Sequence, residues 1–455
     1  MSSAFISDAP LYAAVRAYAD KHPLRLHTPG HAGHGDALGG VFGGLLELDV
    51  TELPETDSLF EADGPILAAE EKAARAFGAA HTLFSAGGAT LCIQAMLRLV
   101  SRGGSRRVVL ARGAHRSAIH TLALLDLEPV WMWPEPFAGS ALPGTVPPQA
   151  VERALETCGG AAAVYLTSPD YYGTLSDIAG IASVCRRYDV PLLVDGAHGT
   201  HLHDLDGGAM HPLVQGAALV CDSAHKTLPV LTGGAYLQMN EGWFSRGEAR
   251  DAMALFGSSS PSYPILLSLD LARAWSERYG AAAFSALRSR VDALYDRLAP
   301  LGLEKPPGPR DPVRITLDVG RVGLSGEEAA ARLRVRGVSI EMHDDRHIVL
   351  LPSALHGDAD FEKLGDALAS LPVRDGVPAA AAPVLEHPQI VMTPGAALRL
   401  PCERLPVERT AGRVAAEGCS PCPPGIPLVC PGERVSVSLA KTLKTYGVNH
   451  LHVIK

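Results

Sequence analysis

Short apolar runs alternate with amphipathic segments through the first half of the chain. Residues 66–79 and 90–102 repeat apolar positions at helical spacing. Six apolar runs bounded by Gly, Pro or Asp are predicted strands: 107–111, 129–133, 162–167, 191–195, 218–222 and 235–239. Parallel strands that are covered on both faces read as continuous apolar runs. The alternation therefore predicts a doubly wound α/β domain.

The segments outside this region predict further domains. A short amphipathic helix fits residues 10–21, and a Gly- and His-rich loop follows it. A long helix fits 263–299, and a Pro/Gly break at 304–312 follows it. Beyond the break, three apolar runs and a helix at 325–336 suggest a small α+β domain. A second soft stretch, 376–383, leads into a Pro- and Cys-rich tail. We therefore expect an N-terminal arm with the large domain, a small α+β domain and a C-terminal domain, at 1–303, 304–377 and 378–455.

Composition and charge exclude several classes of protein. Of the 455 residues 47% are hydrophobic and 20% are charged, which excludes a disordered chain. The net charge is −9 with no long basic run, so neither nucleic acid nor an anionic membrane is an expected partner. No apolar run approaches the ~18 residues that span a bilayer, and the first residues lack a signal-peptide pattern. Eight cysteines in a chain of this length fit a reducing compartment, and we expect a cytoplasmic protein.

Several well-known catalytic motifs are absent from the sequence. No lysine follows a glycine, which excludes the Walker A phosphate loop. The patterns GxGxxG, HExxH and GxSxG do not occur either. Kinase, classical dinucleotide-binding, zinc-peptidase and α/β-hydrolase functions therefore lose their main support.

Three other segments carry candidate chemistry. FSAGGAT at 84–90 is a Gly-rich turn before a predicted helix, where backbone N–H groups suit a phosphate. Asp195 ends a predicted buried strand, the place where open α/β sheets bind ligands. Lys226 follows the next strand, within SAHK, and no other lysine occurs between Lys72 and Lys305. Each segment alone has an ordinary structural explanation as a turn, a helix cap or a solvated loop.

Together the three segments match the needs of pyridoxal 5′-phosphate. The cofactor requires a lysine that forms a Schiff base, an acidic partner for its protonated pyridine nitrogen and an anion site for its phosphate. An aromatic or His side chain should also stack on the ring. His115 follows the strand predicted at 107–111 and is placed to stack, although an ordinary histidine at the start of a helix is the alternative.

At these residues the chain resembles the bacterial ornithine/lysine/arginine decarboxylases of the aspartate-aminotransferase fold. The most specific stretches are SAHKTLP and DGAHG, and PPGIPLVCPGE separates this family from ordinary aminotransferases. Further matching stretches extend over nearly the whole chain: 27–35, 48–59, 113–117, 167–178 and 258–273. The length is similar to that of the shorter members without an N-terminal wing domain. The resemblance implies a fold type I large domain with a mainly parallel seven-stranded sheet, smaller α+β C-terminal domains and a homodimer or an oligomer of dimers.

The resemblance also implies roles for individual residues. Lys226 would be the Schiff-base lysine, Asp195 the pyridine partner, Ala197 the residue under the ring and His115 the residue over it. Further cofactor contacts are expected at Gly88, Ala89, Thr90, His198, Ser223 and His225. Ser259 and Ser260 would reach the phosphate from the neighbouring subunit.

The resemblance implies decarboxylation of a basic α-amino acid: lysine, ornithine or arginine. Lys226 or His225 would protonate Cα after carbon dioxide leaves. The carboxylates of Glu417, Glu341 and Asp344 are candidates for the distal cation of the substrate. The chain departs from the usual family sequence at PETDSLF (54–60), at Gly87-Gly88-Ala89 and at Cys422. The first and third departures lie in regions that touch the substrate by resemblance.

The sequence is compatible with two alternative functions and contains two weaker candidates for a metal site. Another reaction with the same cofactor, transamination or a lyase step, would require an Arg such as Arg399 or Arg404 for the α-carboxylate. A non-catalytic regulatory homologue is the other alternative, and the presence of Lys226, Asp195 and His115 argues against it. Zinc was considered for four cysteines and is not expected there: Cys402, Cys419, Cys422 and Cys430. The segment 203–211 reads as a turn rather than a metal site.

Overall fold

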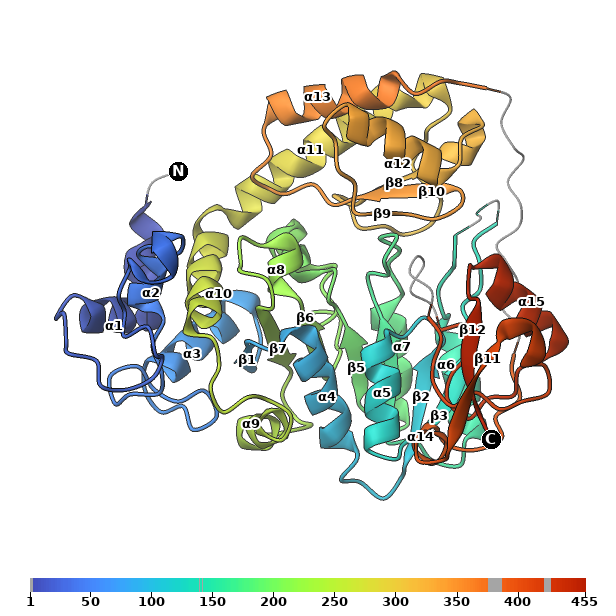
Figure 1. Ribbon diagram of the computed structural model, residues 1–455, viewed down its shortest axis with the longest axis horizontal. Coiled ribbons are helices and arrows are strands. Elements are labelled where there is room, and N and C mark those ends of the chain that lie inside the picture. Colours follow the sequence, from blue (N-terminus) through green and yellow to red (C-terminus); the bar gives the residue numbers. More distant parts are fainter. Residues whose placement is uncertain (1–2, 139, 141, 375–386, 421–426) are drawn as a thin grey trace. The chain divides into compact units, whose positions relative to one another are not determined.

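The computed structural model describes residues 3–138, 140, 142–374, 387–420 and 427–455 (Figure 1). The chain divides into two compact units. The first unit combines Met1–Leu99 with Leu193–Phe284, and the second combines Val100–Leu192 with Ser285–Lys455. Each unit is therefore built from two separated stretches of sequence.

The main sheet has seven strands in the order β1-β7-β6-β5-β4-β2-β3. Its strands are β1 His81–Ser85, β2 Arg107–Ala111, β3 Glu128–Met132, β4 Ala163–Thr167, β5 Leu192–Asp195, β6 Leu219–Asp222 and β7 Ala235–Met239. β2 pairs in parallel with β3 and β4, and β5 pairs in parallel with β6. β7 is antiparallel to both of its neighbours, β1 and β6. The predicted α/β fold with a mainly parallel seven-stranded sheet is confirmed.

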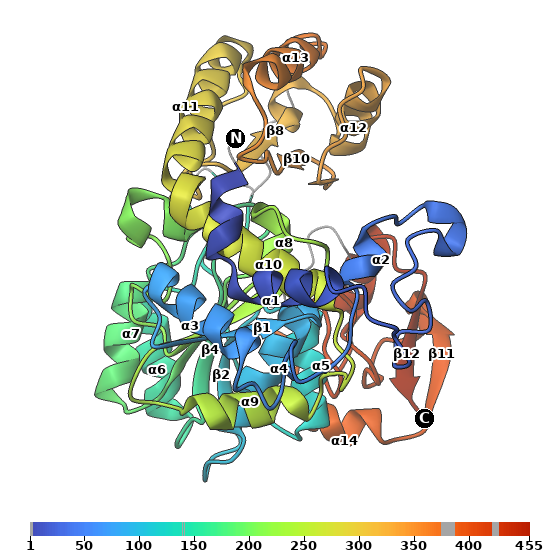
Figure 2. The ribbon, with the colours of Figure 1, turned by 90° about the vertical axis from the view of Figure 1, so that its left-hand side faces the viewer.

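The helices of the first unit cover strands β1, β7, β6 and β5. They are α1 Pro10–Ala19, α2 Leu45–Leu48, α3 Pro65–Phe77, α4 Gly88–Val100, α8 Ala224–Thr227, α9 Arg246–Ala254 and α10 Tyr263–Trp275. Helix α3 begins at Pro65. Proline has no N–H, and it is tolerated there because the first N–H of a helix has no acceptor within the helix. The helix ends at Gly78, which adopts the left-handed conformation. Helix α1 lies against α3 and α10 (Figure 2).

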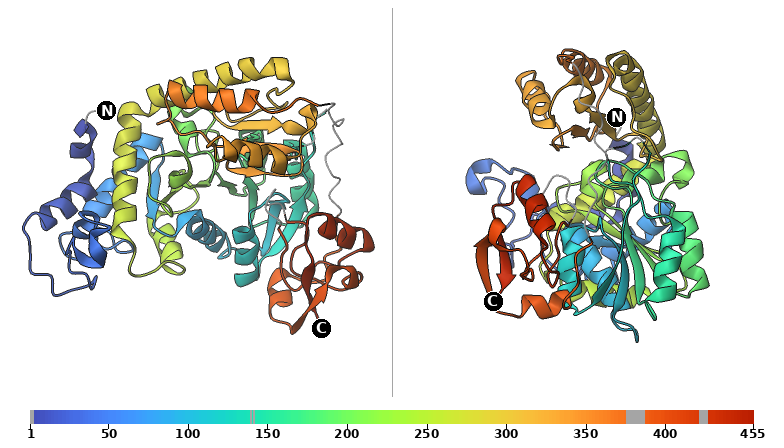
Figure 3. Two further views of the ribbon diagram at one scale, coloured as in Figure 1. Left: turned by 45° about the horizontal axis from the view of Figure 1, so that its top comes forward. Right: turned by 90° about the vertical axis from the view of Figure 1, so that its right-hand side faces the viewer.

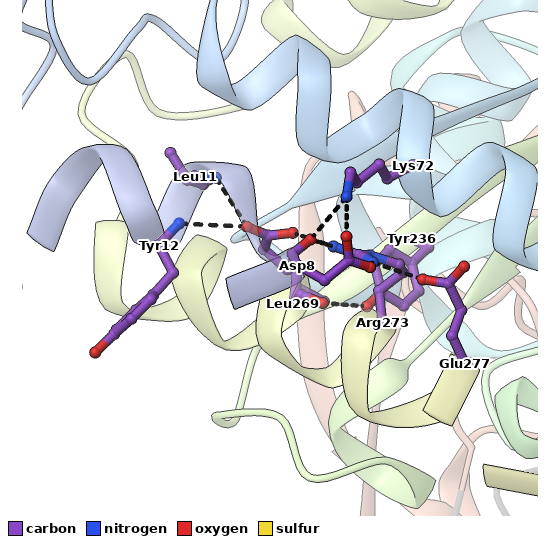
Figure 4. Close-up of polar contacts among 9 residues, drawn as sticks. Asp8, Leu11, Tyr12, Lys72, Tyr236, Leu269, Arg273 and Glu277 are labelled. Carbon is purple, nitrogen blue, oxygen red and sulfur yellow. Dashed lines mark hydrogen bonds and ion pairs between the residues drawn. The ribbon is translucent and has the colours of Figure 1, made fainter. Parts of the chain in front are cut away.

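A buried polar network fastens the N-terminal segment to α10 (Figure 4). The guanidinium of Arg273 is fully buried and contacts Asp8, Asp270 and Glu277. A buried arginine is costly to desolvate unless carboxylates surround it, as they do here. The N-terminal segment is therefore part of the first unit's folded core rather than a loose extension.

The second unit begins with the sheet strands β2, β3 and β4 and their helices. These helices are α5 Arg116–Leu124, α6 Pro148–Thr157 and α7 Ile178–Arg187. A smaller antiparallel sheet, in the order β8-β10-β9, follows later in the chain. Its strands are β8 Ile315–Asp318, β9 Met342–His343 and β10 His347–Leu350.

Three helices accompany the small sheet: α11 Ala281–Leu298, α12 Gly326–Val335 and α13 Asp358–Ala369 (Figure 3). Helices α11 and α13 lie side by side. Arg290 of α11 pairs with Asp358, and Arg297 pairs with Glu362 and Asp366.

The C-terminal part of the second unit has its own small core. It contains α14 Pro394–Leu398, α15 Val437–Thr445 and a two-stranded sheet of β11 Cys402–Pro406 and β12 His450–Ile454. Arg112, which follows β2, is fully buried and forms a bidentate ion pair with Glu433 at 2.5 and 2.8 Å. Its guanidinium also lies over the rings of Trp131 and Trp133. This pair links the C-terminal core to the end of β2.

The structure differs from the sequence prediction at two elements. The long helix predicted over 263–299 is α10 and α11 separated by a π-helical turn at Ser276–Gly280. β7 is antiparallel, although its apolar run reads like those of the parallel strands. Among the described residues, no helix has the length and apolar character needed to cross a membrane.

Candidate active site

The ends of three strands of the first unit lie at the same edge of the sheet. β6 is antiparallel to β7, and β1 is also antiparallel to β7, so β1 and β6 run in the same direction. Ser85 pairs with Ala235, and Asp222 pairs with the adjacent Tyr236. The Gly-rich turn after β1 and the SAHK segment after β6 therefore emerge side by side, next to the end of β5 at Asp195.

Asp195 ends β5 in a buried turn. Its side chain is 2% exposed, and its Oδ1 accepts hydrogen bonds from the backbone N–H of Ala197 at 3.1 Å and from the thiol of Cys221 at 3.5 Å. Gly196 leaves no room for a side chain, because a Cβ there would lie 2.9 Å from Val220 Cγ1. The turn is closed by the Gly199 N–H, which donates to the Gly196 carbonyl at 2.7 Å. These contacts hold the carboxylate in one orientation.

Lys226 lies on α8, a single helical turn directly after β6. The His225 N–H donates to the Gly234 carbonyl at 3.2 Å, and His225 Nδ1 lies 3.0 Å from the same oxygen. A carbonyl oxygen accepts hydrogen bonds, so Nδ1 carries the proton in this contact. Lys226 itself is exposed, on a turn whose first residue, Ala224, is buried. The two contacts of His225 with the Gly234 carbonyl stabilise this turn.

Lys226 and His198 are in direct contact. The Lys226 Nζ lies 3.0 Å from the Nε2 of His198, whose side chain is 6% exposed. His198 follows the Asp195 turn, so the contact joins the end of β5 to the turn after β6. The sequence placed His198 among the cofactor contacts and did not reveal that its partner is Lys226.

The Gly-rich turn after β1 leads into α4. Gly88 has φ +67°, and its N–H donates to the Gly233 carbonyl at 2.8 Å. Gly88 therefore contributes the left-handed conformation that the turn needs, and its N–H is already used by Gly233 rather than offered to an anion. The following residues, Ala89 and Thr90, are in the first turn of α4, where N–H groups have no partner within the helix. An anion would meet those two N–H groups at the positive end of the helix dipole.

Gly233 and Gly234 position both halves of this arrangement. The Gly233 carbonyl accepts from Gly88, and the next carbonyl, of Gly234, accepts from His225. Gly233 has φ +97°, and a Cβ on Gly234 would lie 2.4 Å from Val230 Cγ1. The motif SAHKTLPVLTGGA contains this pair of glycines, but its sequence does not reveal their positioning role.

The three serines predicted near the phosphate have different surroundings. Ser223 is buried at 2% exposure as the residue before α8. Ser259 and Ser260 are exposed, in the loop between α9 and α10. Their predicted role in a neighbouring subunit stays a prediction.

The second unit holds His115 at the start of α5. It is the N-cap of that helix: its Nδ1 accepts the Ser117 N–H at 3.3 Å and lies 2.8 Å from the Ser117 hydroxyl. The ring is exposed. The helix-start geometry considered in the sequence is present, and the predicted stacking on a cofactor ring stays a prediction.

Glu341 and Asp344 lie beside two consecutive tyrosines. Tyr171 donates its hydroxyl proton to Glu341 at 2.7 Å, and Tyr172 donates to Asp344 at the same distance. Asp344 also accepts the backbone N–H groups of Arg346 and His347. Burial raises the pKa of Asp344, but the His347 ring and the backbone N–H groups of His347 and Arg346 together outweigh it, so the pKa is lowered. This geometry suits a structural role for Asp344, whereas Glu341 is exposed and has more freedom to meet a ligand.

The C-terminal part contains Glu417, a candidate for substrate binding, and the cysteines considered for zinc. The exposed Glu417 lies with its Oε1 2.5 Å from Nδ1 of His452. Cys430 is buried, Cys419 is partly buried and Cys402 is exposed. Cys422 lies outside the described residues, so the cysteine cluster as a whole is not described.

A second cluster of buried polar groups lies at the end of β6. It comprises His203, His211 and Asp222, whose potential metal-ligating atoms lie within 4.8 Å of one another. However, His211 Nδ1 accepts the Leu213 N–H at 3.2 Å, so its proton is on Nε2, which points to Asp222 at 3.2 Å. A metal ligand requires that nitrogen to be unprotonated. The cluster is therefore a hydrogen-bonded pair with a stacked histidine, and burial raises the pKa of Asp222 to about 7.

The sheet order, the strand-end carboxylate and the lysine on the following turn define an α/β enzyme of the aminotransferase-like fold. The chain belongs to the Orn/Lys/Arg decarboxylase family. The family's major domain matches residues 9–286, and its C-terminal domain matches residues 379–446. The family resemblance inferred from the motifs is thereby confirmed, and the protein is an amino acid decarboxylase.

Relatives align over nearly the whole chain. An arginine decarboxylase of Halalkalibacterium halodurans is 31% identical, over 94% of this chain and 91% of its own. The arginine decarboxylase of Bacillus subtilis is 28% identical, over 94% and 91%. The constitutive lysine decarboxylase of Escherichia coli is 23% identical, over 94% of this chain and 75% of its own.

Solved structures show the same fold. The lysine decarboxylase of Francisella novicida superposes with a TM-score of 0.82 at 18% identity, covering 98% of this chain and 81% of that one. A serine palmitoyltransferase of Sphingomonas wittichii superposes with a TM-score of 0.55 at 14% identity, covering 80% and 84%. The likeness to the decarboxylase thus extends beyond the large domain.

Proposed function

We propose that this chain is a pyridoxal 5′-phosphate-dependent decarboxylase of a basic α-amino acid. The observation that carries the proposal is the meeting of Lys226, Asp195 and the α4 N-terminus at one edge of the sheet. These are the three groups that this cofactor requires: an amine, a carboxylate and an anion site. Membership of the Orn/Lys/Arg decarboxylase family supports the same reaction.

The described residues fit the cofactor. Lys226 is exposed and can form a covalent bond to an aldehyde, and Asp195 is buried and fixed by two hydrogen bonds. Ala89 and Thr90 offer N–H groups for a phosphate. Ala197 is small and buried beside Asp195, which leaves space for a flat ring. When bound, pyridoxal phosphate supplies the electron sink for the electrons of the Cα–carboxylate bond.

The chain's own residues perform the remaining steps. The Asp195 carboxylate favours a positive charge next to it, which is the electrostatic condition for such an electron sink. The Lys226 ammonium group carries a proton that can be delivered to Cα after carbon dioxide leaves. His225 holds the α8 turn through its bond to Gly234 and keeps Lys226 in reach.

We propose a basic substrate, with arginine as the first amino acid to test. The relatives named arginine decarboxylases match this chain over more than nine-tenths of both lengths, whereas the Escherichia coli lysine decarboxylase is more distant. Glu341 and Glu417 are exposed carboxylates that suit a distal guanidinium or ammonium group.

We propose that the working form is a homodimer or an oligomer of dimers. The N-terminal segment exposes apolar side chains that a partner would cover: Leu24, Leu26, Leu38, Val41, Phe42 and Leu45, each at least 40% exposed. Several exposed apolar side chains in one segment are typical of a segment that forms an interface. The exposed hydroxyls of Ser259 and Ser260 are available to a neighbouring subunit.

One assay tests the proposed function. The purified protein, loaded with pyridoxal phosphate, is incubated with arginine, lysine, ornithine and several acidic and apolar amino acids. Mass spectrometry of the amine formed should identify a single basic substrate, with carbon dioxide released in equal amount. The matched control Lys226→Ala should give neither the visible absorbance of the bound Schiff base nor the amine. A keto acid product, or preference for an acidic amino acid, would contradict the proposal.

A further inference from the structure

Decarboxylation of an amino acid consumes one proton in each turnover. The bond between Cα and the carboxylate breaks, carbon dioxide leaves, and the electron pair that remains forms a new C–H bond with a proton. When the amino group of the substrate takes its place, Lys226 is released as a neutral amine, and it must take up a proton before it can give one to Cα. A protonated group at hydrogen-bonding distance from Lys226 Nζ can supply that proton within the site.

His198 is in the position of such a source. Its Nε2 lies 3.0 Å from Lys226 Nζ, which is hydrogen-bonding distance. Each ring nitrogen of a histidine can carry a proton, so the ring can donate one to a neighbouring amine. The other histidine of the motif, His225, donates its Nδ1 proton to the Gly234 carbonyl and supports the turn.

We propose that His198 is the proton-relay partner of Lys226, a positioning residue that acts through the lysine. The imidazolium Nε2–H donates to the amine Nζ, and the proton passes along this hydrogen bond to leave a neutral imidazole and an ammonium group. Lys226 then gives a proton to Cα. The hydrogen bond exists with the proton on either nitrogen, so the transfer requires no movement of either residue. This inference rests on the proposed function.

The burial of His198 supports this assignment. Its side chain is 6% exposed, whereas Lys226 is exposed. The backbone that carries His198 is held by the turn that Asp195 begins, in which the Gly199 N–H donates to the Gly196 carbonyl. A fixed donor at hydrogen-bonding distance loses little conformational freedom when it acts, which favours efficient proton transfer.

The test compares His198→Gln with the control His120→Gln, which changes an exposed histidine on α5. Glutamine keeps a polar group at position 198 but cannot carry a proton near neutral pH. We expect kcat to fall by about 10²-fold with KM nearly unchanged. The cofactor-loaded variant should keep its visible absorbance, which shows that the site is folded. The control should match the unmodified protein.

Two further readouts separate a proton relay from a merely structural role. Slower delivery of the proton to Cα by Lys226 would favour a side reaction in which the amino group stays with the cofactor and the rest of the substrate leaves as an aldehyde. The ratio of aldehyde to amine should therefore rise in His198→Gln. In His198→Ala, free imidazole should restore part of kcat, and the restored rate should follow the pKa of the added imidazole.

The outcomes distinguish this inference from the proposed function. If the unmodified protein forms an amine while His198→Gln keeps its kcat, pH profile and aldehyde ratio, the relay is wrong and the function stands. Loss of activity in His198→Ala that no concentration of imidazole restores would also overturn the relay. If the unmodified protein neither binds the cofactor nor forms an amine, the proposed function fails and the relay fails with it.

Discussion

The carboxylate of Asp270, on α10, accepts the backbone N–H of Leu11, in the first turn of α1, at 2.9 Å. The same oxygen accepts the N–H of Tyr12 at 3.3 Å. Helix α1 starts with Ala9 as its N-cap, which has no side-chain acceptor, followed by Pro10. Asp270 of α10 therefore satisfies the first donors of α1 in place of a local cap.

Replacing Asp270 should destabilise the first unit. The change Asp270→Ala leaves two backbone N–H groups without an acceptor and removes one partner of the buried Arg273. We expect a loss of about 3–5 kcal/mol in the free energy of unfolding, measured by urea denaturation. The N-terminal segment should also become sensitive to limited proteolysis. Glu277→Gln is the matched control: it changes a partly exposed partner of the same arginine and should cost at most about 1 kcal/mol.

Asp195→Asn should impair catalysis without loss of fold. The amide has the shape of the carboxylate but no charge to stabilise a protonated pyridine nitrogen. We expect turnover to fall by about 10²–10⁴-fold, with the unfolding transition nearly unchanged. Steady-state kinetics and thermal unfolding of the loaded protein provide the check. A variant with normal turnover would refute the assigned role.

Asp204 should make stability depend on pH. Burial raises its pKa from 3.8 to about 6, although the Ser276 hydroxyl donates to it at 2.7 Å. The folded state then binds the proton more tightly than the unfolded state, so this contribution to stability is complete below about pH 4 and is lost as the pH rises to about 6. Relative to Asp204→Asn, the unmodified protein should lose at most about 1.4 kcal/mol per pH unit in this window. Urea denaturation across the pH range measures this difference, and a constant difference would contradict it.

A shared active site predicts recovery of activity on mixing. Lys226→Ala and the double variant Ser259→Ala/Ser260→Ala should each be nearly inactive alone. If Ser259 and Ser260 act in the partner's site, a mixed dimer contains one site with neither change. An equal mixture, unfolded and refolded together, should regain up to about a quarter of the unmodified activity. An active monomer in sedimentation, or a mixture that stays inactive, would show that each chain forms its own site.

Much of the sheet could be predicted from the sequence. The runs at 107–111 and 235–239 coincide with β2 and β7, and the other predicted strands agree within one residue. Buried strands have little freedom in composition, so their apolar runs are distinctive. The direction of β7 was not predictable, because a fully buried strand has the same pattern in a parallel or an antiparallel pair.

The candidate site was predictable in its chemistry and less so in its contacts. Lys226 and Asp195 were found because their residue types at strand ends point to one cofactor. The contact between Lys226 and His198 was not found, since it depends on two turns that meet in space. The π-helical turn at Ser276–Gly280 had no signal either, because its apolar spacing continues that of α10. The division at residues 303 and 377 stays a prediction.

The antiparallel pair of β1 and β7 has a consequence for synthesis on the ribosome. β1 leaves the exit tunnel early, but its partner, residues 235–239, is translated after most of the large domain. At typical translation rates β1 waits on the order of ten seconds. The turn at Gly88 also cannot form its hydrogen bond until Gly233 is translated, because the Gly233 carbonyl accepts the Gly88 N–H. The nascent chain therefore exposes an unpaired apolar strand throughout this interval, which makes the first unit a natural client for a chaperone that binds extended segments.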